Sequence, residues 1–170
     1  ISTAHEDVKF GFSIASGAAW GAINEIESAT SLKLTGVHAH IGSQIFSDEA
    51  FRETATRLIE FMGRYAKEFE RELPDLNLGG GFGVAYIDSD NPIAPSEMLS
   101  QISKIVLQEA SRVKISVPRI SIEPGRAIVG PSMTTIYTVG TTKEVELENG
   151  QSRLYVAVDG GMSDNIRTAL

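Results

Sequence analysis

Residues 34–44 read Leu-Thr-Gly-Val-His-Ala-His-Ile-Gly-Ser-Gln, and this segment is the most informative about the fold. Up to about residue 41 it has the composition of a short strand, and Gly-Ser-Gln then predicts a turn. Strand-like stretches also begin near residues 76 and 119, at roughly constant spacing. Helical patterns separate them, and strands that alternate with helices form a parallel sheet. We therefore predict an α/β fold made of successive β-α units.

Three helices are expected before and between these strands. The first covers residues 17–28. The longest begins at an N-cap offered by Ser47 and Asp48, continues with apolar residues at helical spacing, and is closed by Pro74. The third covers residues 96–113. Each has apolar residues at helical spacing that can pack on a sheet, which agrees with the α/β prediction.

Other stretches have the alternation with period two that is typical of strands. One of them lies before the first helix, at residues 8–14. Three more follow the last β-α unit, at residues 133–139, 143–147 and 153–158, with a hairpin signal at Asn149-Gly150. We therefore expect a (β/α) domain at residues 1–130 and the start of a β domain at residues 131–170.

The composition is ordinary for a globular protein and narrows the classes of function. The 170 residues carry a formal net charge of −7, and their Lys and Arg residues are scattered, which argues against a nucleic-acid partner. There is no cysteine, so disulfides, thiolate metal sites and a cysteine nucleophile are excluded. No stretch is apolar for long enough to span a bilayer, so we expect a cytoplasmic protein without membrane contact.

Two histidines stand at the end of the first strand of the predicted sheet. His38 and His40 lie two residues apart and therefore share one face of the strand, at the carboxyl end where α/β folds place function. A hydrogen-bonded pair without a ligand is the simpler interpretation. No metal is expected, because no cysteine and no third histidine lie nearby in the sequence.

Candidate anion-binding residues follow the other strands. Gly79-Gly80-Gly81 allows backbone N–H groups to approach an anion, although a plain tight turn explains it as well. Glu123 and Arg126 stand three residues apart around Pro-Gly and can contact two parts of one ligand, or simply pair with each other. Arg167 is a further candidate anchor for an anion, with a solvated loop arginine as the alternative.

Taken together, these segments resemble the alanine-racemase-type (fold-type III) pyridoxal-phosphate enzymes, and within them the diaminopimelate decarboxylases. The resemblance is carried by Gly-Val-His-Ala-His-Ile-Gly-Ser-Gln at 36–44, Leu-Gly-Gly-Gly-Phe-Gly at 78–83, Glu-Pro-Gly-Arg at 123–126 and Val-Asp-Gly-Gly-Met-Ser-Asp-Asn-Ile-Arg at 158–167, with Lys-Phe-Gly-Phe at 9–12 in addition. The segments occur in the order of the family. One such motif is weak, but the ordered set is specific.

The resemblance implies part of a (β/α)8 TIM-like barrel followed by the first strands of a C-terminal β domain, in an enzyme that works as a homodimer. It implies pyridoxal 5'-phosphate as cofactor and the decarboxylation of meso-2,6-diaminopimelate to L-lysine and CO2, the last step of lysine biosynthesis. Ornithine, arginine or carboxynorspermidine decarboxylation in the same family stays open, as does a non-catalytic cofactor-binding module. An alanine racemase fits less well, because racemases do not usually show Glu-Pro-Gly-Arg.

The resemblance also assigns roles to individual residues of the expected cofactor site. His40 is expected to stack on the cofactor ring and Glu123 to face the pyridine nitrogen, which makes both candidate catalytic residues. The cofactor phosphate is expected to contact Ser43, the backbone of Gly79, Gly80 and Gly81, and Gly125 with Arg126. Arg126 and Arg167 are the candidates for a substrate carboxylate. His38 receives no role.

Two departures from the family pattern limit this prediction. Thr168 stands where the family usually has proline. The Schiff-base lysine of the family belongs to a strand upstream of Ile1, and none of the lysines present lies in its motif. We therefore expect the chain to be part of a longer enzyme and to be inactive by itself.

Overall fold

The computed structural model describes residues 10–164. It divides the chain into two compact units, Ile1–Ser132 and Met133–Leu170, which are described separately below. Within residues 10–164, no helix combines the length and the apolar character that a membrane span requires.

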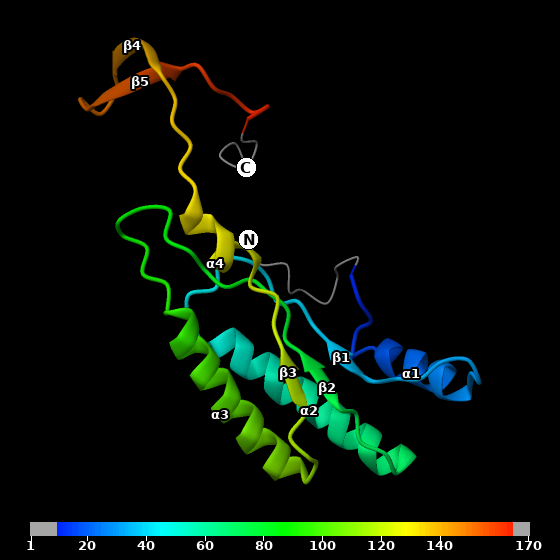
Figure 1. Ribbon diagram of the computed structural model, residues 1–170. Coiled ribbons are helices and arrows are strands. Elements are labelled where there is room, and N and C mark those ends of the chain that lie inside the picture. Colours follow the sequence, from blue (N-terminus) through cyan, green and yellow to red (C-terminus); the bar gives the residue numbers. More distant parts are fainter. Residues whose placement is uncertain (1–9, 165–170) are drawn as a thin grey trace. The chain divides into compact units, whose positions relative to one another are not determined.

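The first unit is built on a parallel sheet with strand order β1-β2-β3 (Figure 1). The strands are β1 (Gly36–His38), β2 (Asp75–Asn77) and β3 (Arg119–Ser121). Val37 lies beside Leu76, and Leu76 lies beside Ile120, so the strands pair without offset of their central residues. The strand order equals the order along the chain, as expected for consecutive β-α units.

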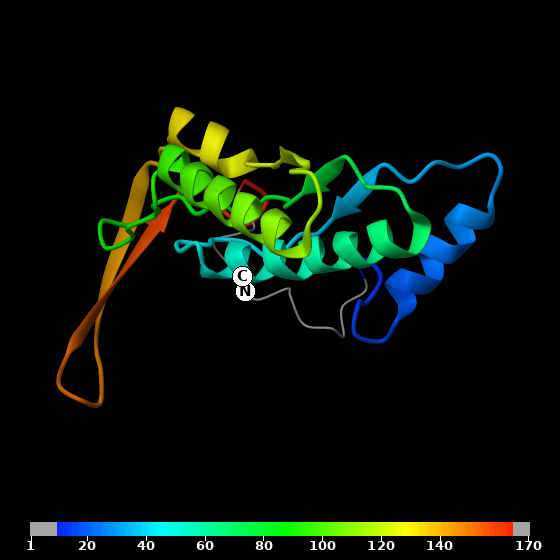
Figure 2. The ribbon, with the colours of Figure 1, turned by 90° about the horizontal axis from the view of Figure 1, so that it is seen from below.

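Helices follow or precede each strand. They are α1 (Ala18–Ser28), α2 (Glu49–Phe69), α3 (Pro95–Val113) and the short α4 (Gly125–Val129), which continues into a 3-10 turn at Gly130–Ser132. The long helices α2 and α3 run side by side along the sheet (Figures 1 and 2). The three helices predicted from the sequence are confirmed within one or two residues at their starts, whereas α4 was not predicted.

The predicted strand at residues 8–14 is wrong over its described part. Residues 10–14 form bends and irregular chain. Gly11 has a φ angle of 72°, which turns the backbone away from an extended path. Phe10 and Phe12 remain 74% and 70% exposed, so the alternation of this stretch is not matched by burial in the first unit.

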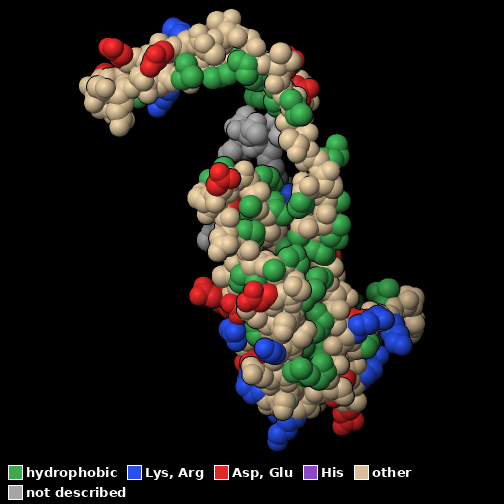
Figure 3. All heavy atoms as spheres, turned by 60° about the vertical axis from the view of Figure 1, so that its left-hand side comes forward, with side chains coloured by type: hydrophobic (Ala, Val, Ile, Leu, Met, Phe, Trp, Pro, Cys, Tyr) green, Lys and Arg blue, Asp and Glu red, His purple; other side chains and the backbone are tan. Residues whose placement is uncertain are grey.

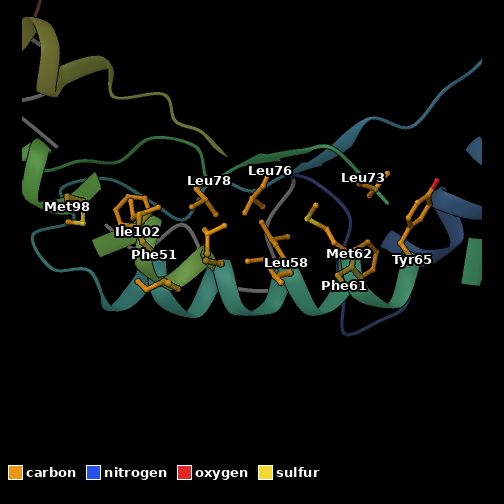
Figure 4. Packing of buried hydrophobic residues seen from close by; sticks show 14 of the residues in the cluster. Phe51, Leu58, Phe61, Met62, Tyr65, Leu73, Leu76, Leu78, Met98 and Ile102 are labelled. Atoms are coloured by element: carbon orange, nitrogen blue, oxygen red, sulfur yellow. The ribbon is translucent and has the colours of Figure 1, made fainter. Parts of the chain in front are cut away.

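The core lies between the sheet and the two long helices. Figure 4 shows Leu58 and Met62 of α2 pointing towards Leu76 and Leu73, which lie on and just before β2. Leu76 is completely buried, as are the side chains that α2 and α3 contribute at helical spacing, among them Phe51, Ile59, Tyr65, Ile102 and Val106. Burial of each such large side chain contributes about 1.5–3 kcal/mol, so these two helices supply most of the packing that fixes the sheet.

The opposite face of the sheet is polar. Because successive side chains of a strand point to opposite faces, the neighbours of buried Leu76 point away from the helices. These neighbours are Asp75 and Asn77. Asp75 forms an ion pair of 2.7 Å with Arg119 of β3. The helix-free face therefore offers charged and hydrogen-bonding groups rather than a second apolar layer.

The second unit is an antiparallel hairpin of β4 (Val139–Glu146) and β5 (Ser152–Val158). Gly150 has a φ angle of 77° in its turn, which confirms the turn predicted at Asn149-Gly150. The predicted strand at 133–139 is wrong except for its last residue, because residues 133–138 pair with no strand among the described residues. Figure 3 shows hydrophobic side chains along the hairpin. Leu154, Val156 and Val158, which alternate along β5, are 61%, 47% and 42% exposed.

Candidate functional site

The carboxyl ends of the three parallel strands lead into three loops that lie against one another. The N–H of Glu123, after β3, donates a hydrogen bond of 2.8 Å to the carbonyl of Gly79, after β2. The N–H of Ile45, in the loop after β1, donates one of 2.9 Å to the carbonyl of Gly81. Backbone hydrogen bonds therefore join segments that are far apart in the sequence into one edge of the sheet.

The glycine segment is held so closely that no side chain fits on it. A Cβ on Gly79 lies 2.5 Å from the carbonyl oxygen of Ala39, and a Cβ on Gly80 lies 2.4 Å from the carbonyl oxygen of Glu123. Gly81 has a φ angle of 97°, where side chains are strained, and its Cβ meets the carbonyl oxygen of Gly42 at 2.4 Å. The bare backbone is thus a requirement of the three-loop contact.

The N–H groups of this segment are not equivalent. The N–H of Gly79 donates to Oδ1 of Asn77 at 2.8 Å, and that of Gly80 makes a long contact of 3.4 Å with Nδ1 of His40. The N–H of Gly81 has no hydrogen-bond acceptor among residues 10–164. Gly80 and Gly81 therefore offer better donors for an anionic ligand than Gly79 does.

Glu123 is the carboxylate of the site. Its side chain is 53% exposed, and its Oε1 accepts a hydrogen bond of 2.8 Å from Nδ2 of Asn77. Nε2 of His38 lies 3.6 Å from the same oxygen. The two histidines thus differ: His38 faces the carboxylate, whereas His40 contacts the glycine segment. In the contact with Gly80, Nδ1 of His40 is the acceptor.

Ser43 and Arg126 meet across 83 positions of sequence. One guanidinium nitrogen of Arg126 donates to the hydroxyl of Ser43, and the other donates to the hydroxyl of Tyr86 at 2.8 Å. Arg126 reaches this place because Gly125 begins α4, with its N–H donating to the carbonyl of Glu123 at 2.9 Å. A hydroxyl and a planar cation side by side form a suitable pair for a phosphate or a carboxylate.

The loop that carries Ser43 is fixed by its neighbour Gln44. The amide of Gln44 donates to the carbonyl of Val84 at 2.9 Å and accepts the N–H of Val84 at 3.1 Å. Gln44 itself has a φ angle of 59°, which only a few side chains adopt readily. This pairing holds the loop after β1 alongside the loop after β2.

The structure thus brings together most of the residues that the sequence singled out. His40, Ser43, Gly79–Gly81 and Glu123 lie on the three adjoining loops, and Gly125 and Arg126 lie at the start of α4, directly after the third loop. Arg167 lies outside the described residues. Asn77 and Tyr86 were not predicted. The signal for Asn77 was available, because asparagine is depleted in strands and this one stands inside a central strand; Tyr86 had none.

The donor set suits pyridoxal phosphate better than a metal ion. Among residues 10–164, no group of three His, Cys, Asp or Glu side chains is placed to hold a metal. A phosphate dianion needs N–H and O–H donors with a cation, which Ser43, Arg126 and Gly81 supply. A carboxylate is the group that pairs with a protonated pyridine nitrogen, and Glu123, in the loop after β3, brings a half-exposed carboxylate to the site.

Comparison with known proteins agrees with this donor set. The family model described as pyridoxal-dependent decarboxylase, pyridoxal binding domain, matches residues 1–130. Diaminopimelate decarboxylase of Mycobacterium tuberculosis is 46% identical over 174 residues, which cover 100% of this chain and 39% of the relative. The enzyme of the same name from Bacillus subtilis is 44% identical over 170 residues, which cover 100% of this chain and 38% of the relative. The chain therefore spans less than two fifths of the length of either relative.

Solved structures give the same result for the fold. Diaminopimelate decarboxylase from M. jannaschii in complex with L-lysine matches with a TM-score of 0.77 and 30% identity, over 96% of this chain and 36% of that chain. The enzyme from Helicobacter pylori, complexed with L-lysine, matches with a TM-score of 0.76 and 27% identity, over 99% and 38% of the two chains. The predicted fold class, part of a (β/α)8 barrel followed by the first strands of a β domain, is confirmed. The chain belongs to the pyridoxal-binding domain family of the pyridoxal-dependent decarboxylases.

Proposed function

We propose that the complete gene product containing this chain uses pyridoxal 5'-phosphate to decarboxylate meso-2,6-diaminopimelate to L-lysine and CO2. The observation that carries the proposal is the placement of Glu123, the bare glycine segment and the Ser43–Arg126 pair on three adjoining loops. The relatives named diaminopimelate decarboxylase, and the matching structures with bound L-lysine, support this choice of substrate and product.

Glu123 sets the charge at one end of the cofactor site. When bound, pyridoxal phosphate supplies a ring that accepts the electrons left on Cα as CO2 departs. A carboxylate beside the ring nitrogen favours the protonated, positively charged ring, which accepts electrons better. Glu123 offers Oε2 for this contact, because Oε1 is already hydrogen-bonded to Asn77.

The other end of the cofactor site is built for the phosphate. Several hydrogen-bond donors are available for it: the hydroxyl of Ser43, the guanidinium of Arg126 and the N–H groups of Gly80 and Gly81. Such a preformed set neutralises a dianion without rearrangement of the protein. His40, whose Nδ1 contacts the N–H of Gly80, is proposed to stack on the cofactor ring and hold it flat.

Recognition of the substrate needs cations, because each diaminopimelate molecule carries two carboxylates. Arg126 is one candidate, and its contacts with Ser43 and Tyr86 orient the planar guanidinium. Arg167 is the second candidate, which rests on the sequence motif alone. The small-molecule amino acid is thus the expected partner, with no nucleic acid and no membrane among the partners.

Further parts of the proposal concern the whole protein. A cytoplasmic homodimer is proposed from the resemblance to the decarboxylase family. Residues 1–130 are proposed as the cofactor-binding barrel portion and residues 131–170 as the beginning of the β domain. The end of the family match at residue 130 and the division after Ser132 support this boundary.

The test is a substrate comparison with the complete gene product and pyridoxal phosphate. Release of CO2 and L-lysine is measured from meso-diaminopimelate, with ornithine, arginine and carboxynorspermidine as parallel substrates. Lysine formation from diaminopimelate alone is the expected result. Turnover of another amino acid keeps the cofactor chemistry and overturns the substrate, whereas cofactor binding without any turnover favours the non-catalytic binding module.

A variant of Glu123 and a matched control separate a specific role of its charge from a general loss of folding or activity. Glu123→Gln keeps the shape but removes the charge, and we expect kcat to fall by about 100-fold, the scale of one lost electrostatic contact in a reacting site. Glu68→Gln is the matched control on the exposed face of α2 and is expected to retain the activity. Equal activity of both variants contradicts the assignment of Glu123.

A further inference from the structure

Asn77 is the side chain that connects the two ends of the site. It lies in the central strand β2, on the face of the sheet opposite the helices, beside His38 of β1. Its Nδ2 donates a hydrogen bond of 2.8 Å to Oε1 of Glu123, and its Oδ1 accepts one of 2.8 Å from the N–H of Gly79. One amide group thus contacts both the carboxylate and the glycine segment.

These two contacts define the orientation of the amide. An asparagine side chain has a donor nitrogen and an acceptor oxygen, and each of them has a different partner here. A flipped amide would place two donors together and an oxygen against the carboxylate of Glu123. The side chain therefore has one orientation that satisfies both contacts, and it transfers that order to Glu123.

The carboxylate of Glu123 needs such support because it is half exposed and sits on a flexible side chain. Its Oε1 is faced by Asn77 and, at 3.6 Å, by Nε2 of His38. Within residues 10–164 its Oε2 has no hydrogen-bond partner. The two neighbours therefore hold one oxygen and leave the other for a ligand.

We propose that Asn77 is a positioning residue that holds Glu123 towards the cofactor ring nitrogen and couples it to the glycine segment at the phosphate. His38, which had no role in the sequence interpretation, assists by facing the same oxygen of Glu123. This inference rests on the proposed function, because it assumes that Glu123 contacts the ring nitrogen.

The contacts on the two sides of Asn77 can be separated by substitution. Asn77→Asp keeps an oxygen for the N–H of Gly79 but replaces the donor to Glu123 with a second carboxylate, which repels it. Asn77→Ala removes both contacts. Ser121→Ala is the matched control, since Ser121 lies on the same face of the adjacent strand and its hydroxyl has no hydrogen bond among the described residues.

The experiment uses the complete gene product loaded with pyridoxal phosphate labelled with ¹⁵N in the ring. We expect the ¹⁵N chemical shift of Asn77→Asp and Asn77→Ala to move towards that of the unprotonated ring at neutral pH. We expect kcat to fall by about 10- to 100-fold in both variants, the scale of one lost hydrogen bond to a charged group. The cofactor Kd is expected to rise in Asn77→Ala and to stay within about threefold of wild type in Asn77→Asp, since that variant keeps the contact with Gly79.

A merely structural role of Asn77 predicts a different result. In that case Asn77→Asp, which keeps the contact with Gly79, leaves the ¹⁵N shift and kcat at the values of wild type and Ser121→Ala, and this outcome overturns the inference. A failure of the proposed function is recognised separately, because the wild-type protein then forms no L-lysine from meso-diaminopimelate, whether or not it binds the cofactor. If the wild type is active while the ring nitrogen is unprotonated in all variants alike, the role of Glu123 at that nitrogen is rejected and the inference with it.

Discussion

Arg119 of β3 and Asp75 of β2 are joined by two contacts of 2.7 Å on the polar face of the sheet. Their side chains are 78% and 28% exposed in the described chain. In a (β/α)8 barrel this face points to the interior, where water has little access. The strength of this ion pair therefore depends on how far a complete barrel shields it from water.

This enclosure can be measured by breaking the pair. If the complete barrel encloses this face, Asp75→Ala is expected to destabilise the complete gene product by about 3–5 kcal/mol, because Arg119 then loses its charge partner away from water. The control is Glu53→Ala, which breaks the exposed Glu53–Arg57 pair on α2 and is expected to cost about 0.5 kcal/mol or less. The free energies of unfolding come from urea denaturation. Equal small losses would show that water reaches the face.

The glycine segment yields a second prediction. Gly80→Ala is expected to destabilise the protein by about 1–3 kcal/mol and to weaken cofactor binding, because its Cβ meets the carbonyl oxygen of Glu123 at 2.4 Å and separates two loops. Gly21→Ala in helix α1 meets nothing within 4 Å and is expected to stabilise by up to about 1 kcal/mol. Thermal unfolding and cofactor titration of both variants provide the check. Retained affinity in Gly80→Ala would contradict the tight three-loop contact.

A buried tyrosine connects α1 and α2 and gives a third prediction. The hydroxyl of Tyr65 donates to Glu27 at 2.7 Å and accepts from Nε of Arg71 at 3.0 Å. Tyr65→Phe is expected to cost about 1–2 kcal/mol, since Arg71 and Glu27 still contact each other at 2.6 Å. The free energy of unfolding from urea denaturation at neutral pH measures this loss.

The same residue predicts how stability depends on pH. Burial raises the pKa of Tyr65 above its ordinary value of 10.0. A raised pKa means that the folded state holds the proton more tightly, so this contribution is fully present below pH 10 and is lost as the pH rises through the folded pKa. The difference between wild type and Tyr65→Phe is therefore expected to shrink above pH 10. A difference that grows in alkaline solution would reverse the sign.

Arg126 supplies a fourth prediction, about the phosphate end of the site. Arg126→Lys keeps the charge but cannot contact both Ser43 and Tyr86 in the same plane. The cofactor Kd or the substrate KM is expected to rise about tenfold, the effect of one lost charged hydrogen bond. Fluorescence titration and steady-state kinetics distinguish the two effects. Arg52→Lys, at the exposed pair with Asp48, serves as control and is expected to leave both constants unchanged.

The hairpin of the second unit gives a fifth prediction. The carboxylate of Asp159 accepts the N–H of Thr138 at 2.8 Å, and this bond lowers the pKa of Asp159 below its ordinary value of 3.8. Because the folded state favours the ionised carboxylate, Asp159 stabilises the folded hairpin at pH values above its ordinary pKa. That contribution is lost as the pH falls through the folded-state pKa. The amide proton shift of Thr138 in an acid titration should have its midpoint below 3.8. In Asp159→Asn this titration should disappear.

The helices were predictable because their signals are local. Residues 49–69 and 95–113 carry apolar side chains at helical spacing over many turns. Such a long periodic pattern identifies a helix even where its first and last residues are hard to predict. The strands were harder, since a strand exists only beside a neighbour. Gly36–His38 is shorter than predicted for this reason, and residues 10–14 alternate in sequence without forming a strand at all.

The order of the sequence motifs was enough to predict which segments form the site, but the types of single residues did not predict which side chains meet there. The meeting of Ser43 and Arg126 depends on the order β1-β2-β3, which brings the loops after β1 and β3 to the same edge of the sheet and which no single motif encodes. Asn77 ends β2, two residues before the glycine segment; the sequence shows its unusual place in a strand but not its contact with Glu123. Its contact with Gly79 is local, whereas its contact with Glu123 becomes visible only when β2 and β3 are paired.

The agreement between strand order and chain order has a consequence for biosynthesis. Among the described residues, β2 pairs with β1 and β3 pairs with β2, so each of these two pairings joins strands that are neighbours along the chain. Such a sheet can grow in the direction of translation, one β-α unit at a time, as the ribosome releases it. Ser43 then emerges long before Arg126, and their contact forms only when the third unit has docked. Formation of the Ser43–Arg126 contact thus marks how far the nascent chain has folded.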